Sequence, residues 1–321
     1  MREMVAVEAR DIDVRLGGPG AFRLQIPELE LNRGQLCAVV GANGAGKTTL
    51  LSVLAGERIP DTGRVRYTLR DSTSSPAAIL DWHTSRTATE RLMERVAFVP
   101  PSPPRWPLRL LEQLELDAAL GGLRGEAAAS WARVWLERLG LQAQAQQHWS
   151  SMSTGFRMRA AIARALMVRL EVLILDEPIG PLDAATQRRV LMDLQGIAHD
   201  RDWPVAVIAS SQHLAEVEAV ADRVIILSNG RIVPGAAALD PSEASVFDIS
   251  CTLSAVSLAS LVPGSHAEDR GSFGVRVHLP APMTAREWLQ HALNAGADVQ
   301  AFRDVSRSSL RFVDNDSPGA L

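Results

Sequence analysis

The stretch Gly41-Ala42-Asn43-Gly44-Ala45-Gly46-Lys47-Thr48 decides how the rest of the chain is interpreted. It matches G-x-x-x-x-G-K-[ST] at every fixed position, and the glycines of this motif allow successive backbone N–H groups to point at phosphate oxygens. The apolar run 36–40 before it predicts a buried strand. The apolar periodicity of 50–54 after it predicts a helix, whose N-terminus attracts anions. The sequence therefore predicts a phosphate-binding loop between a strand and a helix.

Two side chains of this loop have predicted roles of their own. Lys47 is expected to reach the terminal phosphates of a nucleotide and Thr48 to bind Mg²⁺ through its hydroxyl. Of the 33 lysines and arginines in the chain, Lys47 is the only lysine, and a compact ammonium fits a ring of N–H groups better than a planar guanidinium does. The candidate nucleotide contacts in the loop are Gly41, Asn43, Gly44, Ala45, Gly46, Lys47, Thr48 and Thr49.

The composition limits the class of protein. A chain of 321 residues with 46% apolar content can form one large and one small domain. A net charge of -4 gives no general attraction to nucleic acid or anionic lipid, and we expect no nucleic-acid partner. The cysteines, Cys37 and Cys251, suggest neither a disulfide framework nor a metal cluster. No apolar stretch approaches the roughly 18 residues of a membrane span, so we expect a cytoplasmic protein.

The order of elements predicts an α/β fold. Short alternating runs within 4–35 indicate antiparallel strands, and 64–69 reads as another strand. Continuous apolar strands then alternate with helical patterns, which is typical of a mostly parallel sheet with helices on its faces; these strands are 96–99, 172–175, 205–209 and 224–227. Helices are expected over 108–120, 131–139, 156–168 and 214–221, and the polar segment 72–91 is expected to be a surface excursion.

A pair of acids ends one of these buried strands. Asp176 and Glu177 follow the apolar run 172–175, which should lie beside the strand of the phosphate loop. Asp176 can hold Mg²⁺ through water, and Glu177 can orient and deprotonate an attacking water. Isolated acids at a strand end are more often simply solvated, but the phosphate loop in the same chain favours the catalytic interpretation.

In this order of elements the chain resembles the nucleotide-binding subunits of ATP-binding cassette (ABC) transporters. Met152-Ser153-Thr154-Gly155-Phe156 stands one helix before the acidic strand, where this family carries L-S-G-G-Q. The run 157–166 is similar to the family's continuation of that helix. Gly180-Pro181-Leu182-Asp183 stands at its D-loop, and 221–233 resembles its closing hairpin. The resemblance covers about 4–235.

The resemblance implies a domain organisation and partners. Residues 1–238 would form a P-loop ABC ATPase domain with an N-terminal antiparallel β subdomain and a helical subdomain at about 101–168; 239–321 would form a small accessory α/β domain with a frayed tail. Two cassettes, identical or paralogous, would close head to tail over ATP. The residues offered to the partner's ATP would be Ser153, Thr154, Gly155 and Asp183.

A separate transmembrane subunit would dock on the loop 100–107 at the cytoplasmic face of the membrane. Trp106 in that loop either contacts this partner or packs into the helical subdomain, and the sequence favours neither.

Four positions depart from the family's pattern. Pro101 replaces the Q-loop glutamine, and Gln212 stands where the switch histidine is expected, with His213 one place later. Gln212 can donate a hydrogen bond to the γ-phosphate but cannot become cationic. The aromatic residue that stacks on adenine corresponds to Leu16, with Phe22 as a nearby alternative, and the last signature residue is Phe156. We therefore expect ATP binding with slow or partner-dependent hydrolysis.

Several functions remain open at this point. The leading interpretation is an ATPase subunit of a membrane exporter, because 239–321 resembles loosely the small extension of bacterial exporter cassettes. One alternative is a nucleotide-gated binding module with little turnover. Another is an ABC protein of translation or DNA repair, although such proteins carry two cassettes or long coiled coils. A P-loop kinase would leave 152–156 without a purpose.

Overall fold

The computed structural model describes residues 5–18, 22–70, 78–81, 85–212, 214–233, 246–269, 274–279 and 285–304. The chain divides into two compact units, of which the first ends at Val233. The described part of the second begins at Val246. Among the described residues, no helix has the length and apolar character that crossing a membrane requires.

The first unit is built on a single ten-stranded sheet, in the order β5-β4-β1-β2-β10-β9-β3-β8-β7-β6. One end is antiparallel, as expected: β1 pairs with both β2 and β4, and β4 pairs with β5. Apolar residues alternate along these strands because only one face of this part is buried. Their bounds are β1 (Val5–Leu16), β2 (Phe22–Asn32), β4 (Thr62–Leu69) and β5 (Ala78–Asp81).

The other end of the sheet is parallel and carries the phosphate loop. Strand β3 pairs in parallel with β8 and β9, and β7 lies between β8 and β6. These strands are apolar on both faces, which accounts for their unbroken hydrophobic runs. The predicted, mostly parallel core is confirmed, with the bounds β3 (Gln35–Val40), β6 (Val96–Val99), β7 (Val172–Leu175), β8 (Ala206–Ser211), β9 (Arg223–Ser228) and β10 (Arg231–Ile232).

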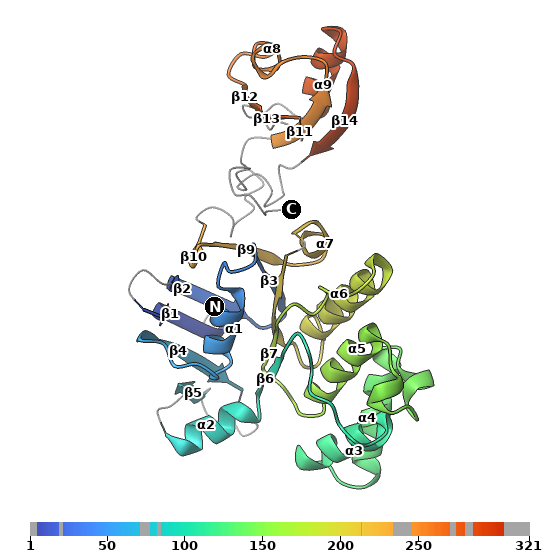
Figure 1. The fold of residues 1–321 in the computed structure, drawn as a ribbon. Coiled ribbons are helices and arrows are strands. Elements are labelled where there is room, and N and C mark those ends of the chain that lie inside the picture. The colour runs from blue at the N-terminus through green and yellow to red at the C-terminus, as the bar shows by residue number, and fades with distance from the viewer. Residues whose placement is uncertain are drawn as a thin grey trace. The chain divides into compact units, whose positions relative to one another are not determined.

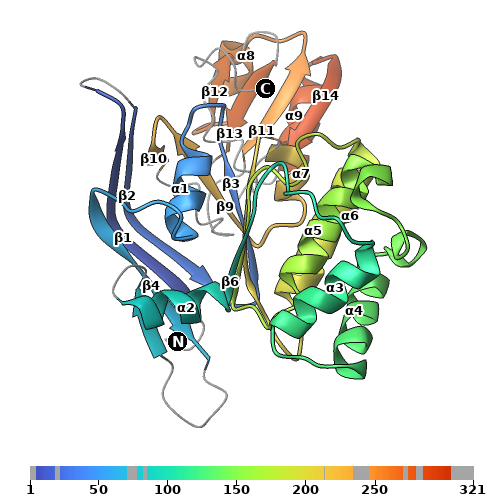
Figure 2. The same ribbon diagram turned by 60° about the horizontal axis from the view of Figure 1, so that its bottom comes forward.

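Helices cover the two faces of the core strands differently (Figures 1 and 2). One hydrophobic cluster joins α1 to the antiparallel strands, and the other joins the core strands to the helical subdomain and α6. The bounds are α1 (Lys47–Leu54), α2 (Arg86–Met93), α3 (Leu110–Leu120), α4 (Glu126–Arg138), α5 (Thr154–Ala165), α6 (Ala184–Ala198) and α7 (Leu214–Glu218), with short 3-10 turns at Gln142–Gln144 and Trp149–Ser151.

One expectation for this unit is corrected, and one of the two alternatives for Trp106 is confirmed. The segment 72–91 is not only a surface excursion, because it contains β5 and most of α2. Helix α2 is mainly polar, but it has a capping serine, Ser85, and buries Ala88 and Leu92. Trp106 packs into the helical subdomain and is only 7% exposed. Its ring lies 4.1 Å from that of Trp149 and under the guanidinium of Arg164.

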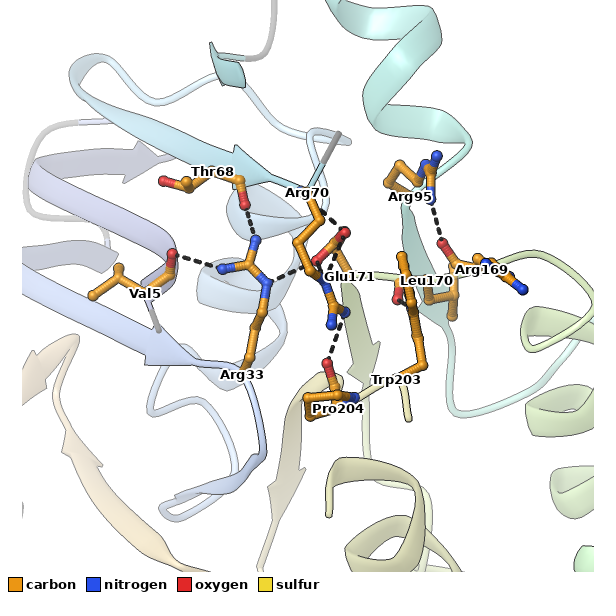
Figure 3. Close-up of polar contacts among 10 residues, drawn as sticks. All are labelled: Val5, Arg33, Thr68, Arg70, Arg95, Arg169, Leu170, Glu171, Trp203 and Pro204. Atoms are coloured by element: carbon orange, nitrogen blue, oxygen red, sulfur yellow. Dashed lines mark hydrogen bonds and ion pairs between the residues drawn. The ribbon is translucent and has the colours of Figure 1, made fainter. Parts of the chain in front are cut away.

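A buried acid ties the antiparallel strands to the start of β7 (Figure 3). Glu171 is 0% exposed, and its carboxylate accepts a hydrogen bond from Arg33 Nε at 2.8 Å. Arg70 donates to the same carboxylate from Nε at 3.0 Å and from its backbone N at 3.1 Å. Arg33 also donates to the carbonyls of Val5 and Thr68, so one residue joins the edges of β1 and β4.

The second unit has its own small sheet, in the order β12-β13-β11-β14, with antiparallel neighbours. Its core includes Phe247 and Trp288, whose rings lie 4.5 Å apart. The strand at His266–Asp269 was not predicted, and the expected frayed tail lies outside the described residues. The bounds are β11 (Val246–Cys251), β12 (His266–Asp269), β13 (Val275–His278), β14 (Val299–Asp304), α8 (Ala255–Ala259) and α9 (Ala285–Asn294).

Candidate nucleotide-binding site

The glycine loop leaves β3 at Val40 and enters α1 at Lys47. Two glycines are required by space. A Cβ atom on Gly41 would lie 2.2 Å from the carbonyl oxygen of Leu227, and one on Gly46 would lie 2.6 Å from the ring of Phe22. Gly46 also has φ of 103°, a conformation that other residues rarely adopt. The loop packs so closely against β9 and β2 that no side chain fits at Gly41 or Gly46, which explains why the motif requires glycine at these two positions.

Lys47 is folded into the loop and is 6% exposed. Its Nζ atom donates to the carbonyls of Gly41 at 2.7 Å and Ala42 at 3.2 Å, and it lies 3.1 Å from Glu177 Oε1. An ammonium has three N–H donors, and these three oxygens can accept all of them. The candidate phosphate ligand and the candidate base therefore form a pair in this structure.

Asp176 lies at the centre of a small hydroxyl network and is 1% exposed. Its Oδ2 atom accepts from Thr48 Oγ1 at 2.8 Å, and its Oδ1 atom accepts from Ser210 Oγ at 2.6 Å. The structure thus brings together the two predicted metal ligands, which lie 128 residues apart in the sequence. Oxygen donors of this kind are the ligands that Mg²⁺ prefers, so this donor set fits that ion.

Sequence reasoning did not single out Ser210 as a functional residue. It lies near the carboxyl end of β8, is 0% exposed, and its Oγ atom accepts a hydrogen bond from the backbone N of Glu177 at 2.8 Å. The signal available in the sequence was a pair of serines that ends an apolar strand run. Because carboxyl ends of parallel strands meet at one edge of the sheet, a polar residue there lies beside Asp176.

Glu177 is held in an unusual conformation. Its φ of 47° is in the left-handed region, which is uncommon for a residue with a side chain. Within the described part of the chain, its Oε2 atom is buried and has no hydrogen-bond partner. An unsatisfied carboxylate oxygen in this position fits a role in accepting a hydrogen bond from a water or ligand that enters the site.

The signature residues and the D-loop form a second cluster. Ser153 caps α5, where its side chain accepts from Phe156 N at 3.4 Å. Asp183 caps α6 and accepts from Thr186 N at 3.0 Å and from its hydroxyl at 2.7 Å, and these hydrogen bonds hold the pKa of Asp183 below its usual value. A Cβ atom on Gly155 would lie 2.6 Å from Thr186, so both loops pack on this threonine.

The remaining predicted residues lie around these clusters. Asn43, Pro101 and Gln212 are exposed, and His213 lies outside the described residues. Leu16 and Phe22 pair across the ends of β1 and β2, and of the two it is Phe22 whose ring is placed against Gly46. The roles of these residues, and of Ala45, Thr49 and Thr154, stay predictions.

Sheet order, glycine loop and acidic strand define a P-loop nucleotide-binding fold of the ABC type. A family model described as "ABC transporter" matches residues 24–180. The chain is similar to "Fe(3+) ions import ATP-binding protein FbpC" of Agrobacterium fabrum, with 31% identity over 70% of this chain and 60% of that protein. It is also similar to "Macrolide export ATP-binding/permease protein MacB" of Rhodopseudomonas palustris, with 33% identity over 65% of this chain and 30% of that protein.

Solved structures agree on the fold. The cbiO1 protein of Clostridium perfringens, described as part of the ABC transporter complex cbiONQ, superimposes with a TM-score of 0.61 at 22% identity, over 72% of this chain and 87% of that one. The ATP-binding cassette MJ0796 gives 0.58 at 22% identity, over 70% of this chain and 96% of that one. The chain belongs to the ABC transporter family of ATP-binding proteins. The matched part of the chain covers 60% of the length of the Agrobacterium fabrum protein and 56% of the length of a similar protein, "Fe(3+) ions import ATP-binding protein FbpC 1" of Rhizobium meliloti.

Proposed function

We propose that this chain is the ATPase subunit of an ABC transporter, which binds ATP and Mg²⁺ at the Lys47 loop and hydrolyses ATP in a head-to-tail pair of cassettes. The observation that carries the proposal is a pair of contacts at one site: Thr48 donates to Asp176 at 2.8 Å, and Lys47 lies 3.1 Å from Glu177. Ser210 hydrogen-bonds both acids and so links the two contacts. Bound Mg²⁺ supplies charge neutralisation between the phosphates. Thr48 and Asp176 would hold it, and Glu177 would take a proton from the attacking water.

The Lys47–Glu177 pair supports the expectation of slow basal turnover. While Nζ of Lys47 lies 3.1 Å from Oε1 of Glu177, the charge of the lysine is directed at this acid and not at a phosphate. ATP binding has to replace this contact by one between Lys47 and phosphate. We propose that closure against a second cassette, with Ser153, Gly155 and Asp183 facing the nucleotide, completes this exchange.

A groove beside the helical subdomain supports docking of a separate membrane subunit. It has a volume of about 890 Å³ and runs from the edge strand β6 past Pro100 and Trp106 to α3. Two of its residues are strongly exposed apolar side chains, Met93 at 68% and Leu120 at 79%. We propose that a cytoplasmic helix of the membrane subunit covers them, in which case this chain would lie at the inner face of the membrane.

Export is the direction that we propose. Its support is the loose resemblance of 239–321 to the extensions of exporter cassettes, and the accessory role of that segment, with the boundary at 238/239, belongs to the same proposal. The relatives reported above are named for both import and export. Transport into or out of vesicles that contain the reconstituted complex measures the direction directly.

Phosphate release by the purified chain tests the ATPase proposal. We expect ATP binding, slow Mg²⁺-dependent phosphate release, and faster release when the membrane partner is added. Glu177→Gln should bind ATP and release no phosphate above background. A wild-type chain that binds ATP but gives the same release as Glu177→Gln, with and without the partner, would favour a nucleotide-gated binding module instead.

The docking surface is tested by a matched pair of variants. Leu120→Glu places a charge in the groove, whereas Met192→Glu places one on α6 at a position that is 56% exposed and does not line the groove. We expect Leu120→Glu to lose stimulation by the membrane subunit and to keep wild-type ATP binding. Equal stimulation of both variants would exclude this groove as the docking site.

A further inference from the structure

Ser210 connects the two acids of the site, although neither the phosphate-loop motif nor the acid pair includes it. We propose that Ser210 is a positioning residue for the metal, which fixes one oxygen of Asp176 and the backbone of Glu177 so that the other oxygen of Asp176 is presented to Mg²⁺. This inference rests on the proposed function, because it concerns the same nucleotide site.

The direction of each hydrogen bond follows from the number of protons. A serine hydroxyl has one hydrogen to donate and lone pairs that accept. The backbone N of Glu177 can only donate, so Ser210 Oγ accepts at 2.8 Å and its own hydrogen is left for Asp176 Oδ1 at 2.6 Å. The orientation of the Ser210 hydroxyl is therefore fixed by its two partners.

As a result, the two carboxylate oxygens of Asp176 have different hydrogen-bond donors. Oδ1 of Asp176 is held by Ser210, whereas Oδ2 accepts from the Thr48 hydroxyl at 2.8 Å and shares its environment with the phosphate loop. A cation would bind a lone pair of the Thr48 oxygen, whose hydrogen still bonds Oδ2, so a free lone pair of Oδ2 would face the ion or a water bound to it. Oδ1 keeps its bond to Ser210, so the plane of the carboxylate is already set before the ion arrives. Partners of metal-binding carboxylates commonly tune affinity in this way.

The second bond of Ser210 acts on Glu177. A left-handed φ of 47° is unfavourable for glutamate, and the hydrogen bond from Glu177 N to Ser210 helps to hold the residue there. Without Ser210 Oγ this N–H would lose its partner in a partly buried position. The same hydroxyl thus couples the orientation of the metal-binding acid to that of the proposed base.

A purely structural role of the Ser210 hydrogen bonds, which would only hold the end of β7 against β8, predicts a different result. Such bonds contribute to the stability of the sheet, and their loss would weaken every property of the site together. A positioning role predicts a selective effect on the metal. ATP binding without a divalent ion depends on the glycine loop and Lys47, so it should be insensitive to Ser210.

Two titrations of the full chain separate these roles. ATP is titrated in the presence of EDTA, and Mn²⁺ is titrated at saturating ATP and detected by electron paramagnetic resonance. For Ser210→Ala we expect a dissociation constant for ATP within about 2-fold of wild type and one for Mn²⁺ raised about 10-fold, at the lower end of such effects. Ser210→Thr keeps the hydroxyl and should restore Mn²⁺ affinity to within about 2-fold.

Tyr67→Phe is the matched control, because it removes another buried hydroxyl away from the acid pair. Tyr67 lies on β4 and is 0% exposed, and its hydroxyl donates to the carbonyl of Leu54 at the end of α1. The substitution should change neither constant. If Ser210→Ala does not fold, Ser210→Cys retains the size of the side chain with a weak donor and should raise the Mn²⁺ constant about 3-fold.

Wild-type Mn²⁺ affinity in the Ala or Cys variant, or a parallel loss of both constants, would overturn the positioning role. Failure of the unaltered chain to bind ATP in EDTA would contradict the proposed function instead.

Discussion

The two ends of strand β7 carry buried acids with opposite surroundings. Glu171 precedes the strand and is 0% exposed, and its carboxylate lies against the guanidinium groups of Arg33 and Arg70. Asp176 follows the strand and is 1% exposed, and its carboxylate accepts hydrogen bonds from the hydroxyls of Thr48 and Ser210. Four apolar residues separate these two environments.

The difference distinguishes a structural acid from a functional one. A buried carboxylate is costly unless its charge is compensated. At Glu171 two arginines supply the compensation from within the chain. Among the described residues Asp176 has no ion pair, and two neutral hydroxyls hydrogen-bond it without cancelling its charge. We therefore propose Asp176 as the acid whose charge a cation from outside would compensate, and Mg²⁺ fits its oxygen donors.

The largest expected effect is on stability, at the Glu171 end. Glu171→Gln removes the negative charge between two guanidiniums, and loss of one partner of a buried ion pair costs about 3 kcal/mol. We expect the free energy of unfolding of the first unit, measured by urea denaturation, to fall by about this amount. Asp176→Asn is the matched control and should change it by less than about 1 kcal/mol. Equal losses in both variants would remove the distinction between the two ends of the strand.

The second effect is on metal binding, at the Asp176 end. Asp176→Asn keeps the shape of the side chain but removes the charge that attracts the cation. We expect Mg²⁺-dependent enhancement of ATP binding to weaken by about 10- to 100-fold, which corresponds to roughly 1.4–2.7 kcal/mol. Isothermal titration with ATP in Mg²⁺ and in EDTA measures it. Glu171→Gln, if folded, should retain the enhancement, and an enhancement that survives in Asp176→Asn would show that the ion is held elsewhere.

A third buried ionisable group has neither kind of compensation. Cys37 lies on β3 and is 1% exposed, and burial raises the pKa of its thiol to about 12. The thiol of the unfolded chain has a pKa near 8.5, so between these values only the unfolded state loses the proton and stability falls as pH rises. The contribution of the buried neutral thiol is fully present below about pH 8 and is lost progressively above it.

We therefore expect a pH slope that depends on this cysteine. Between pH 8 and pH 10 the wild-type chain should lose about 2 kcal/mol more of its free energy of unfolding than Cys37→Ala does. The cavity left by the substitution costs the same at both pH values and cancels in this comparison. Identical slopes in urea denaturation at the two pH values would show that Cys37 ionises freely in the folded state.

Local patterns predicted one of the two acids of β7 and not the other. Asp176 and Glu177 were found because an apolar strand that ends in acids, in a chain with a phosphate loop, is a local signal. Glu171 gave no such signal, since its partner Arg33 is 138 residues away and an acid at a strand start usually faces water. Ser210 was missed for the same reason: its hydrogen bonds to Asp176 and Glu177 depend on β8 lying beside β7.

The fold shows the same limit. The parallel strands and the loop were predicted from continuous runs and glycine spacing, which act over a few residues. Helix α2 was missed because two buried residues, Ala88 and Leu92, anchor an otherwise polar segment. The adenine-stacking position was assigned first to Leu16, by its place relative to the family. Which of two paired residues contacts the loop depends on how the β1–β2 hairpin lies over Gly46, and this is a tertiary property.

The smallest effect tests that position. The ring of Phe22 lies close enough to Gly46 to exclude a Cβ atom there, so it borders the loop, and we propose that the base of a bound nucleotide stacks on it. Stacking of a base on an aromatic ring contributes about 1 kcal/mol or more. We expect Phe22→Ala to weaken ATP binding about 5-fold, and Leu16→Ala, its partner across the hairpin, to change it by less than 2-fold. The Mg²⁺ enhancement should be unchanged in both variants, because it belongs to Asp176.

Binding of inorganic triphosphate, which has no base, should be unaffected by Phe22→Ala. A loss of triphosphate binding would mean that Phe22 supports the loop itself, and a stronger effect of Leu16→Ala would return the stacking role to Leu16.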